Sequence, residues 1–106
     1  NLASREVSAL LEREPKLDAV FANNDYMAIA AIRKIEETGR RVPDDVAVIG
    51  YDDLSVASYV TPKLTSVSQH VAASGKILAR DLVAYIEKGI ITNTCTPVDL
   101  ILRESA

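Results

Sequence analysis

The chain has 106 residues, of which 48% are hydrophobic and 25% are charged. This is the composition of one globular domain or of part of one, with enough apolar residues to bury a core. The formal net charge of -3 argues against a chain that grips phosphate backbones, because modules that bind nucleic acid are usually basic.

A single cysteine, Cys95, excludes an internal disulfide and gives no metal-binding cluster, which fits a reducing compartment. We predict neither a metal nor a cofactor. The sequence has no apolar run of roughly 18 residues, the length that would span a membrane. The chain starts at Asn1 without an initiator methionine. We therefore expect a piece of a longer protein, in which any contact with nucleic acid is made elsewhere.

The first part of the chain predicts a helix, a strand and a second helix. Apolar residues at helical spacing before Pro15 predict a helix over residues 4–14. A brief apolar run predicts a strand over 18–22. The polar residues that follow it are suited to cap a helix over 25–38, which we expect to end at Gly39 because glycine favours the left-handed conformation found there.

The second part alternates in the same way. We predict a strand over 46–50, then an irregular stretch with one helical turn near 56–59, and a third strand over 64–68. A long helix over 72–88 and a last strand over 98–102 follow. Alternating strands and helices predict an α/β fold with a doubly wound, mostly parallel sheet.

The most informative stretch is the unbroken apolar run over residues 46–50, which is followed by Asp52 and Asp53. An apolar run without polar alternation suits a parallel strand covered on both faces. Ligands of open α/β sheets bind beyond the carboxyl ends of such strands. The run therefore predicts that Asp52 and Asp53 lie where a small polar molecule would be bound.

Two helices carry more apolar surface than one contact requires. In the 25–38 helix, Met27, Ala28, Ala31, Ile32 and Ile35 form a stripe facing the sheet. Ile29 widens it to about twice the usual arc. Ile29 is either an isolated exposed residue or part of a subunit interface. The stripe of the 72–88 helix also needs a cover, and whether this helix packs back or swaps onto a second chain is left open.

Four segments together closely resemble the carboxyl-terminal part of the LacI/GalR family of bacterial transcription regulators. They are DAVFANNDYMAIAAIRKIEETG, RVPDDVAVIGYDD, TPKLTSVSQ and PVDLILRES, and the resemblance covers Pro15 to Ser105. It implies part of a type I periplasmic-binding-protein-like core, in which two subdomains flank a ligand cleft. Residues 1–67 and 98–103 would form the carboxyl-side subdomain, and helix 72–88 would cross to the amino-side subdomain. The family's helix-turn-helix is absent from this sequence.

The resemblance also implies site residues. Asn24 and Asp52 match cleft positions that hydrogen-bond the effector, and Gln69 is a weaker match. A further set matches positions at or near the family's dimer interface: Ile29, Ile32, Arg33, Val56, Tyr59 and Val60.

The chemistry of the two cleft residues can be argued from the side chains alone. A carboxylate such as Asp52 accepts charge-assisted hydrogen bonds, and the Asn24 amide both donates and accepts. This pair suits a sugar, a sugar phosphate or a nucleobase.

Neighbouring polar residues have simpler explanations. We expect Asp53 to fix its loop by accepting hydrogen bonds from backbone N–H groups, and Asn23 and Asp25 to cap the helix that follows. We expect the only histidine, His70, to be an ordinary, partly exposed residue near a crossover.

Four functions can be considered. Paired carboxylates at a strand end could hold Mg2+ in an enzyme, but Lys63 is the only nearby lysine and no nucleophile motif is present. We therefore predict that the chain is not an enzyme. The favoured function is part of a cytoplasmic transcriptional regulator that binds a small effector, forms homodimers or larger oligomers, and reaches DNA through another domain. The alternatives are a periplasmic sugar-binding protein of an uptake system and a self-associating fragment without ligand binding.

Overall fold

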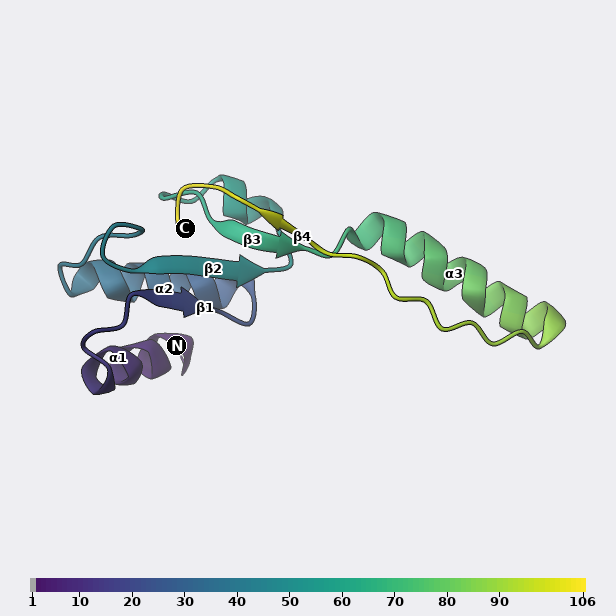
Figure 1. Ribbon diagram of the computed structural model, residues 1–106, viewed down its shortest axis with the longest axis horizontal. Coiled ribbons are helices and arrows are strands. Elements are labelled where there is room, and N and C mark those ends of the chain that lie inside the picture. The colour runs from purple at the N-terminus through teal and green to yellow at the C-terminus, as the bar shows by residue number, and fades with distance from the viewer. Residues whose placement is uncertain (1) are drawn as a thin grey trace.

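The structure of residues 2–106 is a computed structural model (Figure 1). Each predicted helix and strand is present, and its ends differ from the prediction by at most two residues. In chain order the elements are α1 (Leu2–Arg13), β1 (Ala19–Phe21), α2 (Asp25–Glu37), β2 (Ala47–Tyr51), the 3-10 turn η1 (Ser55–Ser58), β3 (Thr65–Ser68), α3 (Val71–Lys88) and β4 (Asp99–Ile101).

The strands form one sheet in the order β1-β2-β3-β4. The first three strands are parallel, and β4 runs antiparallel beside β3. This confirms the predicted α/β fold with a mostly parallel sheet. Because parallel strands end at the same edge of a sheet, the loops that follow β1, β2 and β3 lie together. The candidate site residues come from these three loops.

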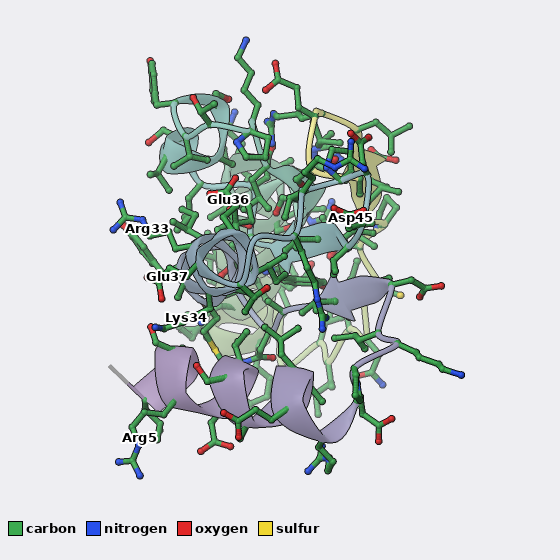
Figure 2. The ribbon with its side chains drawn as sticks, turned by 90° about the vertical axis from the view of Figure 1, so that its left-hand side faces the viewer. Arg5, Arg33, Lys34, Glu36, Glu37 and Asp45 are labelled. Atoms are coloured by element: carbon green, nitrogen blue, oxygen red, sulfur yellow. The ribbon has the colours of Figure 1, made fainter. Side chains whose placement is uncertain are left out.

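Helix α2 covers one face of the sheet and α1 packs against α2, as Figure 2 shows. The core between α2 and the sheet includes Ala28, Ala31, Ile32 and Ile35 of the predicted stripe. Met27, predicted in the same stripe, is 38% exposed and lies at its margin. Ile29 is half-buried and packs against the edge of the core.

The opposite face of the sheet carries no helix within residues 2–106. Phe21 on this face is 67% exposed. Its ring meets the ring of Tyr51 edge to face, with 6.4 Å between the centroids. A doubly wound sheet has helices on both faces, so the described part of the chain leaves one apolar face open.

Helix α3 projects from the rest of the molecule as an arm, together with the segment that returns to β4 (Figure 1). No residue of α3 is buried, and the molecule extends over 59 × 24 × 21 Å. Its radius of gyration is 17.7 Å, compared with about 13 Å for a compact domain of this length. The apolar stripe of α3, which includes Leu78, Leu82 and Tyr85, is exposed. None of the described helices has the length and apolar character needed to cross a membrane.

The Asp45 side chain stabilises the turn that connects α2 to β2. Gly39 takes the expected left-handed conformation after α2, with φ of +83°. The Asp45 carboxylate then accepts hydrogen bonds from the Arg41 backbone N–H (2.6 Å) and from its guanidinium (3.1 and 3.3 Å). These hydrogen bonds stabilise the charged form and hold the pKa of Asp45 below its usual value.

A feature not predicted is the insertion of Ser105 between β2 and β3. Its hydroxyl donates to the Val48 carbonyl (2.6 Å) and accepts from the Thr65 N–H (2.9 Å). Its own carbonyl accepts from the Val48 N–H (2.7 Å). Ser105 and Thr65 have no exposed area, so this residue joins the two strands where their own pairing has not yet begun.

We predict that Ser105→Ala lowers the free energy of unfolding by about 1 to 3 kcal/mol, because it leaves the buried Thr65 N–H without an acceptor. Urea unfolding followed by circular dichroism measures this. Ser55→Ala, which removes an exposed hydroxyl from η1, is the control and should be close to neutral. Equal unfolding midpoints for the two variants would contradict the role of Ser105.

Candidate functional site

The three predicted cleft residues follow three adjacent strands. Asn24 comes after β1, Asp52 directly after β2 and Gln69 directly after β3. The structure brings two of them into contact, because the Gln69 side-chain amide donates to Asp52 Oδ1 at 2.8 Å. Gln69 therefore orients the Asp52 carboxylate.

Asn24 has a structural role of its own. It is the N-cap of α2, with extended backbone angles, and its Oδ1 accepts from the Met27 N–H at 2.9 Å. The prediction that Asn23 and Asp25 provide the cap is wrong, because the middle residue of the three takes that position. Within residues 2–106 no hydrogen bond uses the Asn24 Nδ2 group, so this group can donate to a ligand.

Asp25 lies in the interior and not at an exposed helix end. It has no exposed area. Its Oδ1 accepts from the Ser66 hydroxyl (2.5 Å) and its Oδ2 accepts from the Leu54 N–H (2.7 Å). Gly50 makes this possible, since a Cβ atom at that position would lie 2.3 Å from Asp25 Oδ1. The sequence signal that could have indicated this arrangement is the glycine at the end of the apolar run.

The loop after β2 has a left-handed backbone. Asp52 and Asp53 have φ of 102° and 50°, a region that residues other than glycine adopt at an energetic cost. The Asp52 N–H donates to the Val67 carbonyl (2.9 Å), and the Asp53 N–H donates to the Ser66 hydroxyl (3.0 Å). These hydrogen bonds from β3 hold the loop in its conformation.

Asp53 fixes this loop through its side chain. Its Oδ1 accepts from Arg103 Nη2 at 2.6 Å, and the two side chains are only 22% and 17% exposed. Arg103 Nη1 also donates to the Leu64 carbonyl (2.8 Å). The prediction that Asp53 accepts from backbone N–H groups is wrong as to the partner. Arg103 lies 50 residues further along the chain, and no local pattern connects the two.

His70 is partly exposed, as expected, but it has a partner. Its Nε2 lies 2.6 Å from Asp99 Oδ2. His70 directly precedes α3 and Asp99 begins β4. The pair therefore links the two segments through which the chain enters and leaves the α3 arm.

The polar cluster at the strand ends consists of Asn24, Asp52 and Gln69. It is separate from the hollow between α1 and α2. That hollow has a volume of about 370 Å³ and is lined by Leu11, Lys34 and Arg40 among others. Figure 2 shows Lys34 on the side of α2 that faces α1. The lining residues of α2 come from its carboxyl-terminal half, whereas Asn24 and Asp52 lie at its amino-terminal end.

The chemistry available at the strand ends is hydrogen bonding. A carboxylate and two amides offer donors and acceptors that can match hydroxyl groups. Within residues 2–106, no three His, Cys, Asp or Glu side chains are placed to hold a metal ion. The arrangement suits the recognition of a polar small molecule.

Comparison with known proteins gives a consistent family. A model described as a periplasmic binding protein-like domain matches residues 1–106. The HTH-type transcriptional regulator CelR of Thermobifida fusca is 48% identical over 94 residues, which covers 89% of this chain and 26% of that protein. The ribose operon repressor of Halalkalibacterium halodurans is 32% identical over 105 residues, which covers 97% of this chain and 32% of that protein.

Solved structures agree with these relatives. The structure of a CelR–cellobiose complex superposes with a TM-score of 0.92 at 42% identity, covering 98% of this chain and 32% of that chain. A LacI family transcriptional regulator from Arthrobacter sp. FB24 in complex with lactose gives a TM-score of 0.85 at 29% identity, covering 97% and 40%. Because the likeness covers almost the whole chain, the α3 arm is part of the shared fold.

A mostly parallel sheet with helices packed on it and loops gathered at one edge defines the class of open α/β domains. The chain belongs to the family of periplasmic binding protein-like domains found in LacI/GalR transcriptional regulators, which confirms the resemblance seen in the sequence. It spans 26% and 32% of the lengths of the two curated relatives. These relatives are named as regulators of transcription, in agreement with the prediction that the chain is not an enzyme.

We predict that Asn24→Ala lowers the free energy of unfolding by about 1 kcal/mol because α2 loses its cap, whereas Asn24→Asp, which keeps a capping oxygen, leaves stability unchanged. Thermal unfolding of both variants measures this. Asn23→Ala changes an exposed neighbour and serves as the control. If Asn24→Asp is as unstable as Asn24→Ala, the cap is not what Asn24 contributes.

Proposed function

We propose that this chain is part of a bacterial transcriptional regulator, to which it contributes one wall of an effector cleft and a dimer interface. The observation that carries the proposal is the placement of Asn24, Asp52 and Gln69 at the ends of three adjacent strands. The likeness to a regulator solved with cellobiose supports it. The parent protein would act in the cytoplasm, where transcription is regulated.

The effector would be a sugar or a sugar derivative. Asp52 has a second carboxylate oxygen beyond the one that Gln69 engages, and Asn24 has its Nδ2 group available. An acceptor and a donor on neighbouring loops can bind the adjacent hydroxyls of a sugar ring. A nucleobase-like effector offers similar groups.

The cleft would need a second wall. Ligand sites usually bury most of the ligand surface, whereas the strand-end cluster contributes side chains from one side. We assign residues 1–67 and 98–103 to the carboxyl-side subdomain and helix 72–88 to the amino-side subdomain. The exposed stripe of α3 and the open face of the sheet would pack against other parts of the longer protein.

In the parent protein, the effector would act by bridging the two subdomains. A ligand that contacts both walls favours the relative orientation that it binds more tightly. The dimer would transmit this orientation to DNA-binding domains. The strands β3 and β4, which lead into and out of the α3 arm, lie where such a rotation would occur.

We predict that the 106-residue chain alone binds effector weakly or not at all, because it supplies only one wall. Isothermal titration with cellobiose, lactose and ribose measures this, and titration of the complete regulator with the same sugars is the comparison. Micromolar binding by the isolated chain would contradict the prediction.

The dimer interface would involve α2 and η1. Tyr59 is 84% exposed, while Ile29, Val56 and Val60 are half-buried. Figure 2 places Arg33 on the outer side of α2, away from the sheet. Of the proposed interface residues, Ile32 is buried in the core of its own chain, so it can support the surface but offers little area to a partner.

We predict that the chain forms dimers or larger oligomers and that Ile29→Glu shifts it to a monomer, because a carboxylate would be buried at the apolar centre of the interface. Sedimentation velocity across a range of concentrations measures the oligomeric state. Ile91→Glu, at an exposed apolar residue after α3, is the control. Loss of the dimer in Ile91→Glu but not in Ile29→Glu would assign the interface to the arm instead.

A further inference from the structure

The carboxylate of Asp25 is buried at the point where α2, β2 and β3 meet. It has no exposed area, and both of its oxygens accept hydrogen bonds. It lies in the first turn of α2. With no solvent contact and no free oxygen, Asp25 cannot itself bind a ligand.

The partners of Asp25 belong to the loop that carries Asp52. Its Oδ2 receives the Leu54 N–H directly. Its Oδ1 receives the Ser66 hydroxyl, and that hydroxyl oxygen in turn accepts the Asp53 N–H at 3.0 Å. The carboxylate therefore determines, directly or through one hydroxyl, where the two backbone N–H groups after Asp52 point.

These two N–H groups matter because the backbone before them is strained. Asp52 and Asp53 adopt left-handed φ angles that an aspartate does not prefer. Such a conformation persists only where surrounding contacts stabilise it. The contacts to Asp25 and Ser66 supply this stabilisation from below the loop, on the side that faces the core.

The sequence provides room for this arrangement. Gly50 is the residue of β2 beneath Asp25, and a Cβ atom there would lie 2.3 Å from Asp25 Oδ1 and 3.3 Å from the Ala28 Cβ. The absence of a side chain at Gly50 is therefore a requirement of the Asp25 position.

We propose that Asp25 is a positioning residue, which holds the Asp53–Leu54 backbone so that the Asp52 carboxylate faces the ligand side of the strand ends. The effect on ligand binding rests on the proposed function, whereas the effect on the loop does not. An asparagine at position 25 has the same shape but only one acceptor oxygen, so either the Leu54 N–H or the Ser66 O–H loses its acceptor.

The first experiment follows amide hydrogen exchange by NMR in the 106-residue chain. In Asp25→Asn, exchange at Asp53 and Leu54 should accelerate by about 10- to 100-fold, as expected for the loss of a hydrogen bond to a charged group. The Val48 amide, which donates to the Ser105 carbonyl, and the Ala22 amide, which donates to the Ile49 carbonyl, should keep their rates. Equal acceleration at all four amides, or none at Asp53 and Leu54, would overturn the proposal.

Two further variants complete this experiment. Ser66→Ala removes the hydroxyl but leaves the Leu54 contact in place, so exchange should accelerate at Asp53 more than at Leu54. This variant decides the matter if Asp25→Asn does not fold. Glu36→Gln removes one negative charge from an exposed position of the same helix and should match the wild type. Acceleration at Asp53 and Leu54 in Glu36→Gln would assign the effect to helix charge and overturn the proposal.

The second experiment measures sugar affinity in the complete regulator by titration with cellobiose, lactose and ribose. Asp25→Asn should weaken binding of the sugar that the wild type binds by about 10-fold or more. Wild-type affinity in a variant whose loop exchange is accelerated would overturn the positioning role. Failure of all three sugars to bind the wild type would instead contradict the proposed sugar function, while the exchange rates still decide whether Asp25 holds the loop.

Discussion

The buried carboxyl group of Asp25 organises the loops at the strand ends that carry the candidate site residues. Burying a carboxylate is costly unless hydrogen bonds replace the lost water. Asp25 obtains them from two directions, one from the loop after β2 and one from β3. The two donors lie in the loop after β2 and in β3, and Asp25 itself lies in α2. Both hydrogen bonds therefore form only when these three segments are in the arrangement seen here. The left-handed loop, the glycine in β2 and the orientation of Asp52 all depend on it.

The secondary structure could be predicted because it is encoded locally. Periodic apolar residues, a glycine after α2 and a polar run before it determine the helices and strands with little help from the rest of the chain. The choice among Asn23, Asn24 and Asp25 was different, since all three residue types can cap a helix. Only the space above Gly50 decides that the third of them turns into the interior.

Contacts between distant segments could not be predicted from the sequence. Arg103 reaches Asp53 across 50 residues and Ser105 reaches Val48 across 57, and nothing near either residue marks its partner. The resemblance to LacI/GalR regulators supplied what periodicity could not, namely that residues after three separate strands belong together. The structure places them on one edge of the sheet, while their contact with an effector stays a prediction. The resemblance implied a role for Ile32 at the dimer interface. Ile32 is buried in the core of its own chain, so packing limits the area that it could offer there.

The insertion of Ser105 between β2 and β3 has a consequence for the order of folding. Ser105 follows the whole α3 arm in the chain. The junction between β2 and β3 therefore cannot be completed until that arm has been synthesised. Contacts of such long sequence separation slow folding and leave apolar surface exposed in the meantime. During synthesis, the edge of β3 that pairs with β4 would therefore stay open to other chains until the last residues are made.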